Sequence, residues 1–488
     1  MAGAGIAILW VIAGNFLIFL VIGAVLLIVL RRVAMRLERG LGRNPKGTLW
    51  EMLYTLNTNS GTQLALTMQR AEQGKPAEHP MGSDPAIFWL DQIGFDPATL
   101  DPVPRDRGLA VDLTVQLGPR AKTPLKLSLP MLIAPMGYGV GLNDRAKIAL
   151  SQASSLVGTA ISSGEGPFLP EERAFATNWI LQWSRAEWAH QAAVAQLAGM
   201  IEIQLGQGSE GGIGIVKNSS AVPPRVTDAA HGNVELRTIS PGLIPEWIRE
   251  IREINGEVPI GIKVPANQHL EQDLALLTKW GVDVITVDGS SAGSAGSPAV
   301  ISDHFGLDVG LAIHRAHRWL VAAGIRARVS LIGSGGIHDA ADIAKLLALG
   351  ADAVAVGSTL LFALSHGQVA ENLPNVPPAR LMMAQGQGGA SLKLDLDRAS
   401  EHVAAWFEAT RIELALICQA LGVTSIHDLG PQHLVSRTME ASTRFRLASD
   451  ADPLCWMRIN EALNQLVAHY QASNAVLARL ADQPWFAD

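Results

Sequence analysis

The stretch Val329–Thr359, VSLIGSGGIHDAADIAKLLALGADAVAVGST, decides the fold of this chain. Val329–Gly333 has the apolar character of a short buried strand, and Ser334-Gly335-Gly336 ends it. A helix is predicted to follow. A second apolar strand, Ala353–Gly357, then opens onto another helical run. Two consecutive units of strand, glycine turn and helix are typical of a parallel α/β sheet.

The same two turns predict a phosphate site. Ser334, Gly335 and Gly336 form one turn, and Gly357 and Ser358 form the other. Each turn opens onto a helix start, where backbone N–H groups and the helix dipole favour a dianion. In a (β/α)₈ barrel the usual phosphate site is built from the loops after the last two strands. The alternative is a pair of tight turns with no ligand.

Short apolar runs alternate with helical stretches from Leu129 onward. Eight such runs are the number that a (β/α)₈ barrel needs, and their alternation with helices indicates a parallel sheet. We therefore predict an α/β fold, a (β/α)₈ TIM barrel with an N-terminal transmembrane helix and a helical C-terminal extension. The predicted strands are Met131–Pro135, Thr159–Ser162, Ile180–Trp183, Met200–Leu205, Pro259–Val264, Val284–Asp288, Val329–Gly333 and Ala353–Gly357.

Four domains are predicted along the chain. Residues 1–30 are a transmembrane anchor, 31–128 a juxtamembrane and barrel-covering segment, 129–366 the barrel, and 367–488 a helical extension. Residues 6–30 are almost wholly apolar and long enough to span a bilayer. Basic residues follow this stretch, so the positive-inside rule predicts a single-pass protein of the inner (cytoplasmic) membrane, with its catalytic domain on the cytoplasmic side.

Composition excludes several classes of function. Charged residues make up 17% of the 488, the formal net charge is −7, and no basic patch suggests a nucleic-acid partner. Only two cysteines are present, and no metal-ligand spacing is found. Hydrolase and nucleotidase motifs are absent. Apolar stripes in the C-terminal region indicate packing on the barrel or on a neighbouring subunit. In the second case the protein would be a homo-oligomer.

Candidate reacting groups lie where the predicted strands end, because barrel enzymes keep their chemistry at that edge. Lys263 stands inside the apolar strand sequence Gly261-Ile-Lys-Val264, so its ammonium must enter the barrel mouth or be paired. A fixed cation there would stabilise an anionic cofactor ring. The alternative is a structural pair with Glu202 or Asp288. Glu165, in a glycine-flanked loop, is a candidate catalytic carboxylate or a loop-ordering residue.

Several of these stretches together resemble the FMN-binding synthase domain of glutamate synthases, in particular stand-alone glutamate-synthase-like proteins. The resemblance runs from about Leu129 to Leu429. It implies a barrel that holds FMN, with the phosphate at the two glycine turns and with Gln182 and Lys263 near the flavin ring. The matching stretches include Ala134-Pro135-Met136, Thr159–Gly166, Gln182, Glu202–Gly208 with Gln207, Gly261–Val264 and the two phosphate turns.

The departures from that family fall on the substrate side. The three cysteines expected for an iron–sulfur cluster after the last barrel helix are missing, and so is a glutaminase domain. The loop Gln207-Gly-Ser-Glu-Gly-Gly212 carries Glu210 where the family pattern Gln-Gly-Ala-Lys-Pro-Gly has lysine. Ser290–Ser297 is small and uncharged. We therefore expect 2-oxoglutarate with ammonia to be a poor substrate pair.

The resemblance and the departures together predict a membrane-anchored, FMN-dependent oxidoreductase that transfers hydride at a C–N bond. Its substrate would be a small amine, imine or amino acid, and its electron donor or acceptor is unidentified. One alternative is an FMN-dependent 2-hydroxy acid oxidoreductase, which would need a histidine base near the ring. Another is a non-catalytic flavin-binding scaffold at the membrane.

Overall fold

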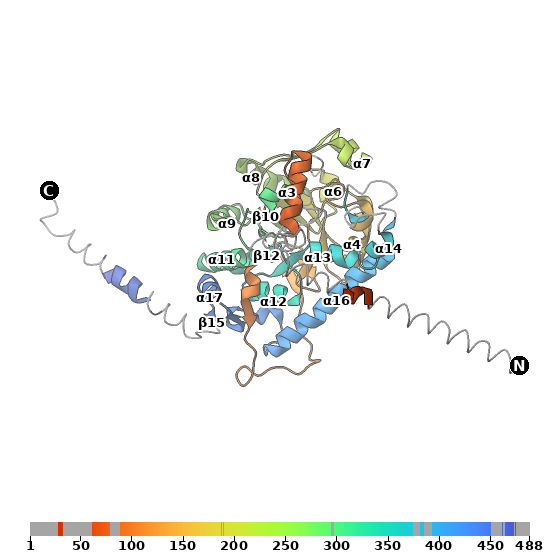
Figure 1. Ribbon diagram of the computed structural model, residues 1–488. Helices are drawn as coiled ribbons and strands as arrows, with labels where there is room; N and C mark the ends of the chain where they lie inside the picture. Colours follow the sequence, from red (N-terminus) through yellow and green to blue (C-terminus); the bar gives the residue numbers. More distant parts are fainter. Residues whose placement is uncertain are drawn as a thin grey trace. The chain divides into compact units, whose positions relative to one another are not determined.

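The computed structural model describes residues 28–32, 61–78, 88–186, 188, 190–293, 297–373, 381–384, 393–449, 461, 464–472 and 474. The chain forms two compact units, Met1–Ala77 and Glu78–Asp488. In the first unit, residues 28–32 are helical and α3 spans Gly61–Gln73. The second unit contains the barrel and everything packed on it (Figure 1).

Eight parallel strands close into a barrel in the order β4-β5-β6-β7-β10-β11-β12-β13. The predicted barrel is therefore confirmed, and all eight predicted strand segments form it. Each strand is short and nearly completely buried, as expected where helices cover the outer face of a parallel sheet. The strands are β4 (Met131–Ile133), β5 (Ala160–Ser162), β6 (Asn178–Trp183), β7 (Met200–Gln204), β10 (Ile260–Pro265), β11 (Val284–Asp288), β12 (Ser330–Ser334) and β13 (Ala353–Val356).

The helices around the barrel follow the expected order, one after each strand. Helix α8 shows why they form: Ile244, Ile248 and Ile251 recur at helical spacing and are buried, and Pro245 stands in its first turn. The covering helices are α4 (Asp144–Leu156), α5 (Pro170–Phe175), α6 (Ala192–Ala195), α8 (Ile244–Ile254), α9 (Leu270–Lys279), α11 (Val309–Ala322), α12 (Ala340–Ala348) and α13 (Ser358–Leu364).

A hairpin closes the amino-terminal end of the barrel. Strands β2 (Val115–Leu117) and β3 (Leu125–Leu127) pair antiparallel just before β4. Between them, the N–H of Gly118 donates to the Ser330 hydroxyl at the start of β12 (3.0 Å). The opposite, carboxyl-terminal end of the barrel stays available for a ligand.

The C-terminal region is helical, as predicted, and it returns to the barrel. The long helix α16 (Leu396–Ala420) packs on α4, α12 and α13 (Figure 1). Strand β14 (Leu434–Ser436) pairs antiparallel with β1 (Ile93–Phe95), which follows the short 3₁₀ turn Trp89–Gln92. Segments from near the two ends of the second unit therefore form one small sheet, which β15 (Ala448–Ser449) completes. Helix α17 (Met439–Phe445) contacts β14 and β15.

The long polar connection from Gly206 to Ser240 folds into an insertion over the barrel mouth. It contains the antiparallel pair β8 (Ile215–Lys217) and β9 (Val234–Leu236), with α7 (Pro224–Ala230) between them. Its apolar residues share a small core with the loops after β4, β5 and β6: Tyr138, Val140, Leu169, Ala186, Trp188, Val222, Val226, Val234 and Leu236.

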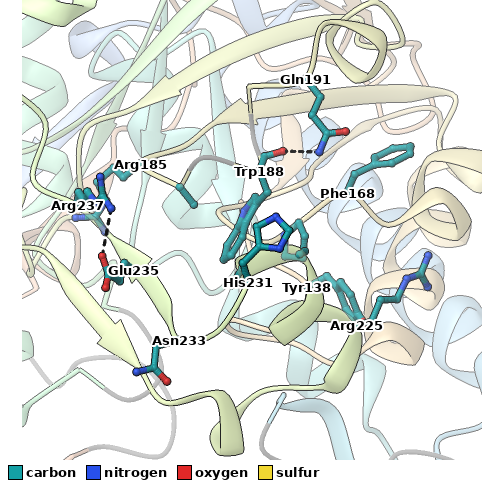
Figure 2. Close-up of a pocket in the computed structure, with 14 residues that line it drawn as sticks. Tyr138, Phe168, Arg185, Trp188, Gln191, Arg225, His231, Asn233, Glu235 and Arg237 are labelled. Atoms are coloured by element: carbon teal, nitrogen blue, oxygen red, sulfur yellow. Dashed lines mark hydrogen bonds and ion pairs between the residues drawn. The ribbon is translucent and has the colours of Figure 1, made fainter.

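A cavity of about 790 Å³ lies between this insertion and those loops (Figure 2). Arg185, Arg225 and Arg237 line it together with aromatic side chains. The guanidinium of Arg225 is paired with Glu171 (Nη1–Oε1, 3.1 Å) and that of Arg237 with Glu235 (Nη2–Oε2, 3.4 Å). The positive charges of this cavity are therefore largely neutralised by carboxylates of the same chain.

The predicted membrane anchor is corrected by the structure. Within the described ranges, no helix is long and apolar enough to cross a membrane. Of the predicted span, residues 6–30, the structure describes residues 28–30. Residues 6–27 lie outside the described residues. The predicted inner-membrane localisation is therefore wrong by this finding.

Candidate active site

The phosphate turns predicted from the sequence meet at the carboxyl-terminal end of β12 and β13. Gly335 and Gly336, directly after β12, adopt positive φ angles of +106° and +70°. Gly357 precedes α13 and has no side chain to cap it, so the first N–H groups of that helix need an external partner. Among the described residues, the N–H groups of Gly335 and Gly336 donate to no backbone acceptor.

The space at the first turn admits only glycine. A Cβ at Gly336 would lie 2.7 Å from Cε2 of Phe88 and 2.9 Å from Cβ of Ser291. A Cβ at Gly335 would lie 2.8 Å from the backbone nitrogen of Ala292. Neighbouring chain thus packs closely behind both glycines, and their backbone is left bare on the remaining side. This is the cradle that a phosphate group fits.

Both turns open into one cavity of about 450 Å³ at the barrel mouth. Lys263 on β10 and Asp288 on β11 also line it, so a ligand with its phosphate at the turns would share this cavity with that pair. Ten residues predicted to bind the cofactor line this cavity: Ala134, Pro135, Met136, Gln207, Lys263, Ser334, Gly335, Gly336, Gly357 and Ser358. The residues present therefore fit a mononucleotide such as FMN.

Lys263 lines the cavity and also forms an ion pair. Its Nζ lies 2.8 Å from Oδ2 of Asp288 on the neighbouring strand, and both side chains are buried. Burial alone would lower the pKa of Lys263, but the carboxylates of Asp288 and Glu202 outweigh it and raise the pKa above its usual value. The ammonium is therefore held in its charged form.

Asp288 has capacity left for another partner. Its Oδ2 accepts from Lys263 and from the N–H of Gly208 (3.0 Å). Its Oδ1 is buried and has no hydrogen-bond partner in the part of the chain that the structure describes. Asp288 lines the same cavity. A buried carboxylate oxygen in this state indicates a donor supplied by a ligand or by water.

Gln182 does not line the cavity. Its side chain is buried, and its Nε2 donates to Oε1 of Glu202 (3.1 Å). The other oxygen of Glu202 accepts from the Thr286 hydroxyl (2.6 Å). Burial raises the pKa of Glu202, while Lys263, Thr286 and Gln182 act in the opposite direction. Gln182 is thus placed behind Lys263, where it orients the carboxylate that helps to hold the ammonium.

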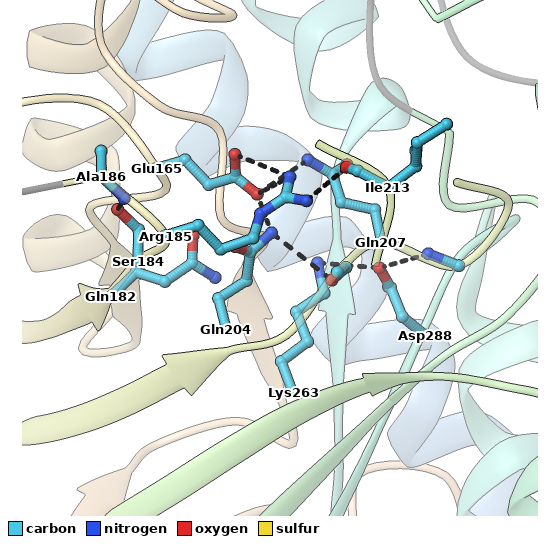
Figure 3. A network of polar contacts seen from close by, with 12 residues as sticks. Glu165, Gln182, Ser184, Arg185, Ala186, Gln204, Gln207, Ile213, Lys263 and Asp288 are labelled. Atoms are coloured by element: carbon cyan, nitrogen blue, oxygen red, sulfur yellow. Dashed lines mark hydrogen bonds and ion pairs between the residues drawn. The ribbon is translucent and has the colours of Figure 1, made fainter. Parts of the chain in front are cut away.

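Glu165 also lies outside the cavity lining, in the polar network that Figure 3 shows. Its two carboxylate oxygens accept from Nη2 of Arg185 at 3.2 and 3.3 Å. The same carboxylate accepts from Nε2 of Gln204 and, at 3.5 Å, from Nε2 of Gln207. Gln207 lines the flavin-sized cavity, so Glu165 reaches the site only through its neighbours.

Sequence reasoning did not single out Arg185 and Gln204. Arg185 is the second residue after β6, where a charged residue soon after the apolar run WILQW was the available signal. Gln204 and Glu202 are two residues apart on β7, and alternate positions of a strand face the same side. Among the described residues, no group of three or more His, Cys, Asp or Glu side chains could hold a metal ion.

The family model and the sequence relatives identify one family. A family model described as "Conserved region in glutamate synthase" matches residues 112–424. A glutamate synthase large subunit-like protein of Rhizobium meliloti (strain 1021) is 31% identical over 356 residues, which cover 68% of this chain and 80% of that protein. An archaeal-type glutamate synthase (NADPH) of Thermotoga maritima is 31% identical over 329 residues, covering 61% and 64%.

The chain thus spans about four fifths of the first relative and somewhat less than two thirds of the second. Among solved structures, a lactate oxidase of Pediococcus acidilactici matches with a TM-score of 0.47 and 14% identity, covering 74% of this chain and 89% of that one. This likeness carries no information on the substrate.

Proposed function

This chain belongs to the glutamate synthase family, and on that premise we propose that it transfers hydride at a C–N bond, by imine reduction or amine oxidation. The resemblance predicted from the sequence is confirmed, and so is FMN as its cofactor. The protein is an FMN-type oxidoreductase of the glutamate synthase type. The reacting bond and the substrate are the proposed part.

The observation that carries the proposal is that Lys263 and the two glycine turns line the same cavity. Bound FMN supplies a ring that accepts or donates hydride. The turns hold a phosphate, while the charged ammonium of Lys263 stands where an electron-rich ring edge needs a cation. Asp288 and Glu202 keep that ammonium charged and fixed in position.

Oxidation of a 2-hydroxy acid is less well supported. That reaction needs a base such as histidine to take the hydroxyl proton. Among the described residues that line the cavity, His338 is the one histidine, and it lies just after the phosphate turn Ser334-Gly335-Gly336. Its side chain is 69% exposed and faces Asp342 (Nδ1–Oδ2, 3.4 Å). A histidine at that end of the cavity cannot serve a substrate beside Lys263.

The proposal is tested with the purified full-length protein. We expect a yellow protein that releases FMN on denaturation, and whose flavin is bleached anaerobically by a primary amine or amino acid from a broad panel. L-Lactate and other 2-hydroxy acids serve as the matched control. Bleaching by the 2-hydroxy acids alone would contradict the C–N assignment, and colourless folded protein would contradict the function as a whole.

A further inference from the structure

A buried carboxylate stands without a partner beside the polar network of Glu165. Glu210 is 6% exposed, and neither of its oxygens has a hydrogen-bond partner among the described residues. The nearby Ser297 hydroxyl acts to lower the pKa of Glu210, but it does not reach hydrogen-bonding geometry with either oxygen. A buried carboxylate left in this state is costly unless something supplies donors.

The polar atoms near it show which kind of ligand would fit. Gln204 donates its Nε2 to Glu165 and to the carbonyl of Gly206, so the orientation of its amide is determined by two acceptors. This leaves the Oε1 of Gln204, which is buried, without a partner among the described residues. The Ser209 hydroxyl, also buried, has none either. Carboxylate and amide oxygens only accept hydrogen bonds, so the missing partner must be a donor.

The loop that carries Glu210 borders the flavin-sized cavity, although Glu210 is not among the residues that line it. Gln207 lines that cavity, and the N–H of Gly208 donates to Asp288. The N–H of Glu210 donates to the carbonyl of Gln207 (3.1 Å) in a tight turn. A Cβ at Gly208 would lie 1.8 Å from the carbonyl oxygen of Gly289. The carboxylate is thus held by a closely packed loop next to the Lys263–Asp288 pair.

We infer that Glu210 binds the ammonium group of an amine substrate, with the Oε1 of Gln204 as a second acceptor. The inference rests on the proposed function and names its substrate class: a primary amine that presents N–H donors and positive charge to the mouth of the barrel. Glu210 is then the specificity-determining residue of this site.

The charges that face Glu210 favour a cation. Burial raises the pKa of Glu210, and the nearby carboxylate of Glu165 raises it further, while Arg185 and Lys217 act to lower it. Arg185 is already bound to Glu165, and the Nζ of Lys217 donates to the carbonyl of Val140 (2.7 Å). Neither cation lies within ion-pair distance of Glu210 in the described structure. A bound ammonium group would supply the missing cation.

The test measures binding to the oxidised holoprotein, independently of turnover. Methylamine, n-butylamine and benzylamine are titrated by calorimetry and by perturbation of the flavin spectrum, each beside its alcohol of the same shape. We expect at least one amine to bind at least tenfold more tightly than its alcohol. Glu210→Gln should abolish that preference, and Glu210→Asp should retain part of it.

The matched control is Glu235→Gln, the same chemical change on the same insertion, at a carboxylate that is exposed and paired with Arg237. This variant should bind amines like the wild type. Equal amine affinity in wild type and Glu210→Gln, with flavin content unchanged, would overturn the inference, and so would absence of amine binding by flavin-loaded wild type. Those outcomes would not contradict the proposed function. The proposed function fails separately if the protein carries no flavin, or if 2-hydroxy acids alone bleach the flavin.

Binding should also depend on pH through Glu210. Because the carboxylate must be ionised, amine affinity should rise as pH increases through its raised pKa, and this rise should be absent in Glu210→Gln. The charged groups that face Glu210, which are Glu165, Arg185 and Lys217, are present in both proteins. Identical pH profiles for the two proteins would contradict the assignment.

Discussion

At the scale of single residues, Lys263 has two tasks that mutation can separate. Lys263→Met should slow flavin reduction by about 100-fold, because loss of an electrostatic stabilisation of about 3 kcal/mol has that effect on rate. It should also lower the melting temperature, since Asp288 then remains buried without its partner. Stopped-flow reduction with the best amine of the panel and a thermal scan measure the two effects.

The double variant Lys263→Met/Asp288→Asn serves as the control. It removes the uncompensated charge, so we expect it to recover most of the lost thermal stability but not the reduction rate. If reduction recovers together with stability, Lys263 is only structural, which was the alternative weighed from the sequence.

The glycines of the phosphate turns offer a second residue-scale test. Gly336→Ala should weaken FMN binding at least tenfold, because the added Cβ would meet Phe88 at 2.7 Å and the φ angle is +70°. Gly357→Ala is the matched substitution in the other turn. There the nearest atom to the new Cβ is that of Ala134 at 3.6 Å, an ordinary contact, so FMN should be retained. Equal loss in both variants, measured by equilibrium dialysis, would contradict the described packing.

At the scale of elements, Asp308 joins helix α11 to the segment that covers the barrel. Its Oδ1 accepts from the N–H groups of Gly310 (2.9 Å) and Leu311 (3.2 Å) at the helix start, and its Oδ2 accepts from the N–H of Trp89 (3.2 Å). Burial raises the pKa of Asp308 to about 6, although these three donors lower it. The stabilisation that Asp308 provides as the N-cap of α11 should therefore depend on pH.

The sign of that dependence follows from the raised pKa. The folded-state pKa of about 6 lies above the unfolded value of about 3.9, so the stabilisation is complete below that lower value and is lost as pH rises through 6. A difference of this size corresponds to at most about 3 kcal/mol in the free energy of unfolding. In Asp308→Asn this contribution is absent. Urea unfolding of both proteins between pH 4.5 and 7.5 should therefore show the variant gaining stability relative to wild type with rising pH, whereas parallel profiles would refute the assignment.

At the scale of the whole molecule, FMN should stabilise the barrel, because its site is built from the ends of strands that are distant in sequence. Residues in or just after β4, β10, β11, β12 and β13 come together at one cavity. A ligand that binds only the folded state stabilises it by about 2.7 kcal/mol at a concentration 100 times its dissociation constant. Flavin-free protein should therefore melt at a lower temperature, and added FMN should restore the melting temperature.

Riboflavin is the control for this whole-molecule effect. It carries the ring but lacks the phosphate, so at the same concentration it should stabilise the flavin-free protein clearly less than FMN does. Equal stabilisation by the two compounds, measured by calorimetry, would show that the glycine turns contribute nothing to binding.

The sequence by itself determined the barrel strands and the phosphate turns. Both depend on local patterns: apolar runs set strands, helical periodicity sets helices, and glycine at positive φ sets turns such as Gly335-Gly336. Most predicted cofactor residues line one cavity for the same reason, since the ends of parallel strands must meet at one edge. Membrane localisation was the prediction that failed, because an apolar run does not establish a spanning helix.

Only the tertiary structure decided which polar side chains face the ligand and which face each other. Strand register places Pro265 beside Asp288, and across these neighbouring strands the Lys263 ammonium meets the Asp288 carboxylate. Glu165 was weighed as a catalytic carboxylate or a loop-ordering residue. In the structure Arg185 pairs with it away from the cavity lining, and Glu210 has no partner among the described residues. These outcomes depend on distances between residues far apart in the chain. Periodicity and spacing carry no information about such distances, because they report only on neighbours along the sequence.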